Sequence, residues 1–207
     1  MDPGQSAKLS LLIATNNTGK LKEFERLLTG LPVQLSGLAE FEDIGEIEET
    51  GVTFEENAVL KARGYAVRSG MWALADDSGL EIEALGGRPG VYSARYAGTG
   101  AGYGQKIAAL LNELDETGDT GRRARFVSVI AVADERGEIK FLAEGVCAGT
   151  IAGAPRGTNG FGYDPIFIPD GFGQTFGELT PDIKEQISHR ARAAAKIIRY
   201  LRDFTGV

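Results

Sequence analysis

Two short polar segments, each following an apolar run, carry residue types that bind phosphate and metal. Residues 15–20 read Thr-Asn-Asn-Thr-Gly-Lys and follow the apolar run 9–14. Where a strand ends and a helix begins, the backbone N–H groups at the helix start favour an anion, and Lys20 adds a full positive charge. Residues 76–79 read Asp-Asp-Ser-Gly and follow the apolar run 71–75. Adjacent carboxylates repel each other, so a buried pair is typical of a divalent-cation site that activates water. Together the two segments indicate hydrolysis of a nucleotide phosphate.

The first polar segment has two interpretations that its residues alone do not separate. Phosphate binding would use the residues Thr15, Asn16, Asn17, Thr18, Gly19 and Lys20. Asn and Gly are equally ordinary residues of a turn between a strand and a helix. The segment is not a Walker A loop, which would need glycine in place of Ala14 and Ser or Thr in place of Leu21. A second glycine-rich stretch, residues 98–104, lacks the G-x-G-x-x-G spacing, and we predict a mobile loop there without a nucleotide role.

The acidic residues also have two interpretations. Asp76 and Asp77 would hold magnesium, which takes one or two carboxylates together with waters and substrate phosphates. Glu49 belongs to a second acidic patch with Glu46 and Glu48. The alternative is that both patches are solvated, and it is stronger for Glu46 and Glu48 than for the two aspartates.

A third group of residues, late in the chain, has the chemistry to read a nucleotide base. It comprises Phe161, Gly162, Tyr163 and Asp164, followed later by Ser188, His189 and Arg190. A loop aromatic stacks on a base, and Asp, His or Arg can hydrogen-bond to its polar edges. Each has a structural alternative: the aromatic residues as core, the lone histidine as a structural or surface residue, and Ser188 as a helix cap. Lys61 and Lys184 would ordinarily be solvated.

Composition limits the class of protein. The chain has 207 residues, enough for one domain or two closely joined lobes with a real hydrophobic core. Its 22 basic and 29 acidic residues give a net charge of -7, which disfavours nucleic-acid binding. The single cysteine, Cys147, suits a reducing cytosol, so we expect a cytoplasmic protein. No apolar stretch approaches a membrane span, and residues 1–8 are expected to be a ragged start without a signal-peptide core.

Hydrophobic periodicity predicts an α/β fold with a mixed central sheet and helices on its faces. Strands are predicted at residues 9–14, 31–35, 71–75, 126–133, 139–148 and 166–168. Helices are predicted at residues 21–28, 53–69, 106–114 and 188–201. Thr53 and Glu56 fit a capping box, and Gly70 would close that helix. The strand at 71–75 would place Asp76 and Asp77 at its carboxyl end, where ligands bind in open α/β sheets.

The ordered set of these segments closely resembles the inosine/xanthosine triphosphate pyrophosphatases over residues 9 to 201. The segments that carry the resemblance are residues 15–20, 49–62, 76–80, 86–95, 161–165 and 188–190. The resemblance implies hydrolysis of dITP, ITP or XTP to the monophosphate and pyrophosphate with magnesium, which removes deaminated purine nucleotides from the pool. It also implies a homodimer in which residues 1–207 form one two-lobed pyrophosphatase domain, with the site in a cleft between the lobes.

The resemblance assigns roles by position. Residues 15–20 would hold the triphosphate. Glu49 and Asp77 would lie at the metal, with Asp76 assisting, and Asp77 would be the proton acceptor. The remaining substrate contacts would be Lys61, Ser78, Phe161, Gly162, Tyr163, Asp164, Lys184, His189 and Arg190. The chain departs from the family pattern in two places: residues 97–105 lack the usual Asp and Asn, and Glu185 replaces the usual Asn beside Lys184.

Two competing functions remain. The Maf-like nucleotide pyrophosphatases share a related architecture and favour other bases. A catalytically silent nucleotide-binding module would need no Asp77 beside Asp76. All of these interpretations place the lysine turn and the aspartates on opposite sides of a single crevice.

Overall fold

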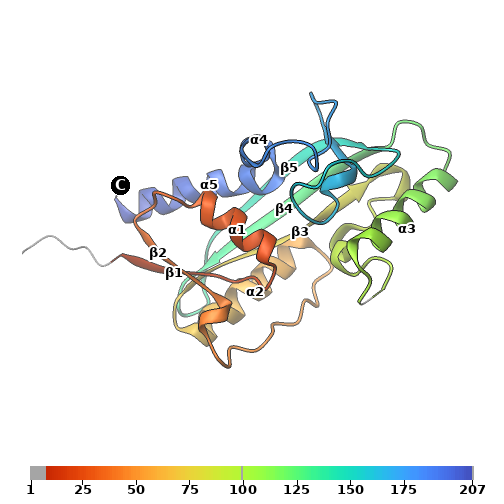
Figure 1. Cartoon of the computed structure of the whole chain (residues 1–207). Helices are drawn as coiled ribbons and strands as arrows, with labels where there is room; N and C mark the ends of the chain where they lie inside the picture. Colours follow the sequence, from red (N-terminus) through yellow and green to blue (C-terminus); the bar gives the residue numbers. More distant parts are fainter. Residues whose placement is uncertain (1–7, 99, 207) are drawn as a thin grey trace, which may run out of the picture. The chain divides into compact units, whose positions relative to one another are not determined.

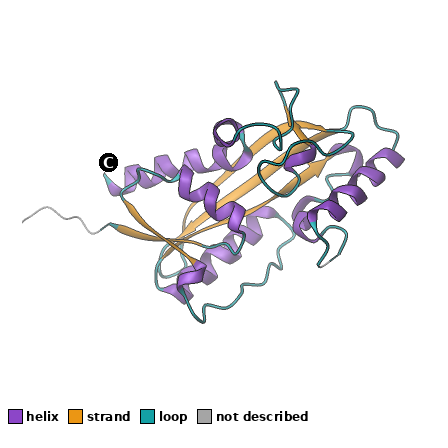
Figure 2. Ribbon diagram, in the orientation of Figure 1, coloured by secondary structure: helices purple, strands orange, loops and turns teal. Residues whose placement is uncertain are grey.

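The computed structural model describes residues 8–98 and 100–206 and confirms an α/β fold with a mixed six-stranded sheet. The predicted ragged start lies outside the described residues except for Lys8, and so does Thr99 of the predicted mobile loop. The strands lie in the order β2-β1-β3-β4-β5-β6. β1 pairs in parallel with β2 and β3, whereas β5 and β6 are antiparallel. Figure 1 labels the elements along the chain, and Figure 2 shows their types.

The strands and helices have the following bounds. The strands are β1 (Leu9–Ile13), β2 (Val33–Gly37), β3 (Trp72–Ile82), β4 (Arg123–Ala133), β5 (Ile139–Ile151) and β6 (Phe167–Pro169). The α-helices are α1 (Thr18–Leu27), α2 (Phe54–Ser69), α3 (Tyr103–Glu116), α4 (Pro181–Ile187) and α5 (His189–Thr205). Short 3-10 turns lie at Leu38–Glu40, Glu83–Leu85, Gly90–Arg95 and Asp164–Ile166. Among the described residues, no helix has both the length and the apolar character needed to cross a membrane.

The chain divides into two compact units, each with its own hydrophobic core. The first unit contains the chain up to Asp77, Val129–Ala143 and the chain from Ala193, and the second contains Ser78–Ser128 and Glu144–Arg192. The first core includes Leu11, Ile13, Phe24, Leu28, Leu74, Ile130, Val132, Ile197 and Leu201. The second includes Leu80, Ile82, Ile107, Leu110, Leu114, Phe126, Cys147, Tyr163, Phe167 and Phe176. The expected cleft between two lobes stays a prediction.

Helix α1 begins earlier than its apolar residues indicate. The sequence predicts a start at Leu21, but the helix begins at Thr18 with Asn17 as its N-cap. The Asn17 side chain accepts hydrogen bonds from the backbone N–H groups of Gly19 and Lys20, at 2.9 Å and 3.1 Å. An asparagine cap satisfies N–H groups that the first helical turn cannot pair, so half of the expected turn is helical.

Helix α2 has the predicted bounds and caps. The Thr53 hydroxyl accepts a hydrogen bond from the Glu56 backbone N–H at 3.1 Å. The Glu56 carboxylate accepts from Val52 at 2.7 Å, one residue earlier than a capping box requires. Gly70 ends the helix with φ +67°, a left-handed conformation that glycine adopts without steric cost. The local sequence therefore encodes both ends of α2.

Strand β3 is longer than predicted, and this corrects the position of the two aspartates. The apolar run stops at Ala75, but the strand continues to Ile82, so Asp76 and Asp77 lie inside it rather than at its carboxyl end. β1 pairs with β3 only as far as Leu74, whose carbonyl accepts from Ala14 N–H at 2.8 Å. The aspartates therefore lie beyond the carboxyl end of β1, next to the chain that enters α1.

Other boundaries differ by a few residues. β2 begins two residues later than predicted, and β4 and β5 extend further. Helix α3 begins at Tyr103, so residues 103 and 104 of the expected loop are helical. Helix α4 was not predicted, because its seven residues are too short for a clear helical period.

Candidate active site

The turn that leads into α1 is closed by its own hydrogen bonds. The Thr15 hydroxyl accepts from the Asn17 backbone N–H at 3.1 Å, and the Asn17 side chain caps the helix. Lys20 extends from the first helical turn and forms an ion pair with Asp76, at 2.8 Å between Nζ and Oδ2. The turn is thus a well-capped start of a helix, and its binding of phosphate stays a prediction. The lysine turn is in direct contact with Asp76. The crevice expected between the turn and the aspartates stays a prediction.

A buried cluster of acids and lysines forms in the first unit. Lys61 Nζ lies 2.6 Å from Glu49 Oε1 and 3.5 Å from Asp77 Oδ1, and it donates to the Asp76 backbone carbonyl at 2.8 Å. Asp76 is 2 % exposed, Asp77 7 % and Lys61 9 %. The solvated interpretation is therefore wrong for these three residues. We call Lys20, Glu49, Lys61, Asp76 and Asp77 the acid–lysine cluster.

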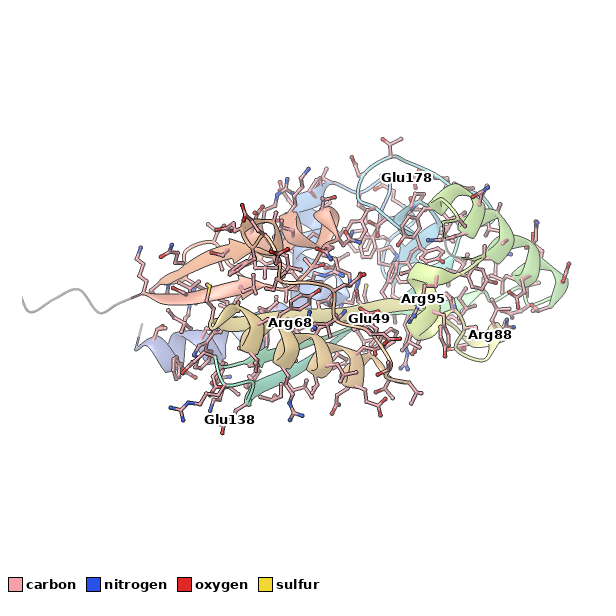
Figure 3. The ribbon with its side chains drawn as sticks, turned by 90° about the horizontal axis from the view of Figure 1, so that it is seen from below. Glu49, Arg68, Arg88, Arg95, Glu138 and Glu178 are labelled. Carbon is pink, nitrogen blue, oxygen red and sulfur yellow. The ribbon has the colours of Figure 1, made fainter. Side chains whose placement is uncertain are left out.

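The outer part of the acidic patch is different. Glu46 and Glu48 are exposed, as the solvated interpretation predicts, whereas Glu49 is half-buried. Figure 3 labels Glu49 in the segment that precedes α2. The segment thus turns one of its three glutamates inward, toward Lys61.

Burial and neighbouring charges together shift the pKa values of Asp77 and Lys61. Burial raises the pKa of Asp77, and the charges of Glu49 and Asp76 raise it further, while Lys61 and Lys20 act against these effects. Burial alone would lower the pKa of Lys61, but the charges of Asp77, Glu49 and Asp76 outweigh it and raise that pKa. Lys61 therefore stays positively charged, and Asp77 accepts a proton more readily than an exposed aspartate does.

The donor set fits a hard divalent cation. Within residues 8–98 and 100–206, no three acidic, histidine or cysteine side chains meet in the geometry of a metal site. The carboxylates of Glu49, Asp76 and Asp77 instead contact lysine ammonium groups. The cluster thus brings three carboxylates together with two ammonium groups, and the Asp76 and Asp77 carboxylates are buried. Carboxylate oxygens are the ligands that magnesium prefers, so the residues suit that ion.

Asn57 is a member of the site to which the sequence assigned no role. Its side chain is fully buried on α2, four residues before Lys61. Nδ2 donates to Asp77 Oδ2 at 3.2 Å, and Oδ1 accepts from the Gly51 N–H at 2.8 Å. The four-residue spacing from Lys61 is the signal that predicts a shared helix face.

A second cluster lies wholly in the second unit. Lys184 pairs with Asp164 at 2.5 Å, and its ammonium group lies 4.7 Å from the centre of the Phe161 ring. The Arg190 guanidinium lies 5.7 Å from the same ring, and its Nη2 donates to the Ser78 hydroxyl at 2.8 Å. We call Ser78, Phe161, Asp164, Lys184 and Arg190 the cation–aromatic cluster.

The other residues predicted to read the base make contacts within the protein, and their part in base recognition stays a prediction. Tyr163 is buried in the core, and its hydroxyl donates to the Ser93 carbonyl at 2.9 Å. His189 is buried and stacks on Phe126, with ring centres 4.7 Å apart. Ser188 caps α5 by accepting from the Ala191 N–H at 3.2 Å. Gly162 has φ +68°, which favours glycine where the loop turns before Tyr163.

Lys184 is buried, so the expectation that this lysine is solvated is wrong, as it is for Lys61. Lys184 is 6 % exposed, and Asp164 is 2 % exposed. The Asp164 carboxylate also accepts from the Phe161 N–H at 2.7 Å, so it holds the loop that presents the ring. Asp164 is therefore a loop-ordering residue as well as the partner of Lys184.

Known proteins are similar in sequence to this chain over most of its length. A dITP/XTP pyrophosphatase of Synechococcus sp. (strain CC9311) is 49% identical over 185 residues, which cover 89% of this chain and 86% of that protein. A dITP/XTP pyrophosphatase of Geobacillus kaustophilus (strain HTA426) is 47% identical, with 95% and 96% covered.

Solved structures agree with these relatives. The structure of a HAM1 protein from Coxiella burnetii matches with a TM-score of 0.87 and 43% identity, and covers 94% of this chain and 99% of that one. The Staphylococcus aureus Ham1 protein matches with a TM-score of 0.83 and 42% identity, with the same coverage of the two chains. Residues 11–200 match the Ham1 family, and the chain belongs to that family.

Proposed function

We propose that the chain hydrolyses dITP, ITP and XTP to the monophosphate and pyrophosphate, and so removes deaminated purine nucleotides from the pool. The observation that carries this proposal is the buried acid–lysine cluster, in which Lys20 and Lys61 meet Asp76 and Asp77. Such a cluster supplies both the cations that polyphosphate needs and the carboxylates that a metal needs. The relatives named dITP/XTP pyrophosphatase support the reaction.

Glu49, Asp76 and Asp77 are the proposed ligands of Mg²⁺. Magnesium bound there would neutralise charge on the phosphate oxygens and polarise the reacting phosphoryl group. The lysines that now pair with the carboxylates would then be available to the triphosphate, together with residues 15–20. Carboxylates outnumber ammonium groups among the five side chains of the cluster, and a divalent cation would attract them more strongly than the singly charged lysines do.

Asp77 is the proposed proton acceptor for the attacking water. A general base works best when its pKa lies near the working pH, and burial raises the pKa of Asp77 in that direction. Its Oδ2 is held by Asn57, which fixes the plane of the carboxylate. The water would attack the α-phosphorus with pyrophosphate as the leaving group.

The second unit supplies the proposed base-reading residues. Inosine and xanthosine present an oxygen at C6 where adenine presents an amine. Arg190 and His189 can donate hydrogen bonds to that oxygen, and adenine would leave these buried donors without acceptors. Phe161 would offer a ring face to the base, and the loop of Gly162, Tyr163 and Asp164 would hold that ring in place. Ser78 and Lys184 complete the proposed substrate contacts.

One assay tests the function. The protein is incubated with dITP, XTP, dATP and dGTP, with Mg²⁺ or with EDTA, and phosphate and pyrophosphate are measured separately. We expect pyrophosphate from dITP and XTP, much less from dATP and dGTP, and none in EDTA. Equal rates with all four would refute the base selectivity and leave the hydrolase. A preference for other bases would favour a Maf-like enzyme, and absence of pyrophosphate a silent binding module.

We also propose a homodimer that works in the cytoplasm. The dimer follows from the family resemblance, and the cytoplasmic site of action from the nucleotide pool on which the proposed reaction operates. Light scattering during size-exclusion chromatography tests the dimer, with an expected mass twice that of the 22.0 kDa chain. A single-chain mass at micromolar concentration would contradict it.

A further inference from the structure

One face of α2 lies along the acidic segment that carries Glu49. The residues of this face recur at the three- and four-residue spacing of a helix: Asn57, Lys61, Gly64, Tyr65 and Arg68. Each of them contacts a different point of residues 44–51. Figure 3 labels Arg68, near the end of α2, and Glu49, in the segment that precedes the helix.

The contacts run in reverse order along the two segments. At the start of the helix, Asn57 accepts from the Gly51 N–H at 2.8 Å, and one turn later Lys61 meets Glu49 at 2.6 Å. At the far end, Arg68 donates to the carbonyls of Ile44, at 2.8 Å, and Glu46, at 3.3 Å. Eleven helical residues rise about 17 Å, a span that seven residues of extended chain can match. The segment is therefore held at both ends and in the middle.

The fit between helix and segment depends on glycines. A Cβ at Gly64 would lie 2.5 Å from Ile47 Cδ1, so the Ile47 side chain packs directly on the helix backbone. A Cβ at Gly51 would lie 2.6 Å from Glu56 Cβ and 2.7 Å from Asn57 Oδ1. Neither glycine has a positive φ, so close approach rather than backbone conformation requires them. A side chain at Gly51 would clash with the start of α2, and a side chain at Gly64 would force the Ile47 side chain to move.

We propose that the α2 face with Asn57, Gly64 and Arg68 is a positioning device for the site. It holds residues 44–51 in one register, and this register brings Glu49 to the acid–lysine cluster. Asn57 couples the two halves of the device, because the amide that holds Gly51 also holds the Asp77 carboxylate. The residues act on metal binding through Glu49 and Asp77 and touch no substrate themselves. This inference rests on the proposed function.

The first test changes the position of residues 44–51 on α2 without weakening the helix itself. Gly64→Ala improves helix propensity, so it does not weaken α2, but its methyl group displaces Ile47. We expect Mg²⁺ binding to the nucleotide-free protein, measured by calorimetry, to weaken by about 10-fold, the lower end for loss of support to metal ligands. The Mg²⁺ concentration for half-maximal activity should rise in parallel, while kcat at saturating Mg²⁺ changes little.

A compensating variant tests the proposed contact directly. Ile47→Val removes the Cδ1 atom that the new methyl group would meet. We expect Gly64→Ala with Ile47→Val to recover most of the Mg²⁺ affinity. The matched control is Gly104→Ala on α3, where a Cβ would have nothing within 4 Å and Mg²⁺ affinity should not change.

The second test acts from the far end of the segment. Arg68→Ala removes the hydrogen bonds to the carbonyls of Ile44 and Glu46. We expect faster amide hydrogen exchange at Ile47 and Gly51 and weaker Mg²⁺ binding, and a smaller change for Arg68→Lys. Arg63→Ala, on an exposed part of the same helix, is the control that should change neither.

The outcomes distinguish this inference from the proposed function. A wild-type protein that releases no pyrophosphate refutes the function, whatever the variants do. Unchanged Mg²⁺ affinity in both Gly64→Ala and Arg68→Ala overturns the positioning role even when the wild type is active. Faster amide hydrogen exchange in residues 44–51 with unchanged Mg²⁺ affinity overturns the positioning role too. The segment would then be more mobile without any effect on metal binding. If Ile47→Val does not restore Mg²⁺ affinity in Gly64→Ala, the proposed contact between residue 64 and Ile47 does not set the position of residues 44–51.

Discussion

The acid–lysine cluster and the cation–aromatic cluster differ in which sign of formal charge is in the majority among their side chains. In the first unit, three carboxylates meet two ammonium groups, so the excess charge is negative. In the second unit, Lys184 pairs with Asp164, and both Lys184 and Arg190 face the Phe161 ring. Among the five residues of this cluster, two carry a formal positive charge and one a formal negative charge. A negative excess prepares a place for a cation, whereas donors beside an aromatic face suit a base that carries hydrogen-bond acceptors.

The difference also shows in what holds each cluster. The acid–lysine cluster is built mainly on regular elements, with its lysines on α1 and α2 and its aspartates on β3, and only Glu49 lies on an irregular segment. The cation–aromatic cluster depends on the loop before β6, which Asp164 orders through the Phe161 N–H. Rigid elements position reacting groups accurately, and loops adapt to the shape of a ligand. We therefore assign the chemical step to the first cluster and the choice of base to the second.

Removal of the proton acceptor gives the largest expected effect. Asp77→Asn keeps the shape of the side chain and abolishes its basicity. Turnover of ITP should fall by at least about 100-fold, in line with the ordinary contribution of general-base catalysis. Steady-state pyrophosphate release at saturating Mg²⁺ measures it, with Asp115→Asn, exposed on α3, as the control. Near-normal turnover in Asp77→Asn would show that Asp77 is not the proton acceptor. The acid–lysine cluster would then serve only to bind the metal and the triphosphate.

Arg190 tests the assignment of selectivity to the second cluster. Arg190→Lys keeps the charge but loses the planar fork that reaches Ser78. A hydrogen bond to a charged group contributes about 1.5–3 kcal/mol, so kcat/KM for ITP should fall by about 10- to 100-fold. The value for dATP should change much less, and selectivity should shrink accordingly. Arg192→Lys, two residues further along α5 and bonded to the Val146 carbonyl, is the control. An equal loss with both nucleotides would mean that Arg190 only supports the fold.

The raised pKa of Asp77 predicts a stability effect with a defined sign. A raised pKa means that the folded state binds this proton more tightly than the unfolded state, so the stabilisation is present at low pH and is lost as pH rises through the folded-state pKa. In EDTA at pH 7, Asp77→Asn should therefore be more stable than the wild type. A gain of about 1 kcal/mol would raise Tm by about 2–4 °C.

Thermal unfolding at pH 4 and pH 7 measures this effect. The advantage of Asp77→Asn should be smaller at pH 4, where the wild-type carboxylate is closer to protonation. A variant that is less stable than the wild type at both pH values would show that the lysines stabilise the Asp77 charge more than burial penalises it. The charge excess assigned to the first cluster would then be wrong.

The sequence predicts the fold and the chemistry of the site better than it predicts positions. Helix α2 was predicted within a residue, because Thr53 and Gly70 are local signals that need no tertiary partner. Asp76 and Asp77 were recognised by type but were placed at the end of a strand, because two acids interrupt the apolar run that indicates β3. Strand pairing, which is set by the neighbouring strand, decides where β3 ends.

Non-local contacts account for the rest. Ser78 and Arg190 are 112 residues apart, and no periodicity in the chain predicts their hydrogen bond. Tyr163 belongs to the core although its loop also presents Phe161, because aromatic residues suit both places. The sequence could have predicted that Asn57 lies near the site, because its four-residue spacing from Lys61 places both residues on one helix face. Its partner Gly51 was not, because that contact depends on the path of an irregular segment.

The smallest expected effect concerns chemical labelling of Cys147. It tests whether the core of the second unit stays closed while the loop with Phe161 adapts. Cys147 is buried in this core, and burial raises the pKa of its thiol to about 11. The thiolate is the reactive form, so native protein at pH 8 should resist iodoacetamide and react only once unfolded in urea. Intact-protein mass spectrometry gives the measurement, and the unfolded chain is the positive control. Addition of ITP and Mg²⁺ should leave this protection unchanged if the loop with Phe161 adapts without opening the core. Rapid labelling of the native protein would show instead that the core opens together with the loop, and the division between rigid and adaptable parts would not hold for this unit.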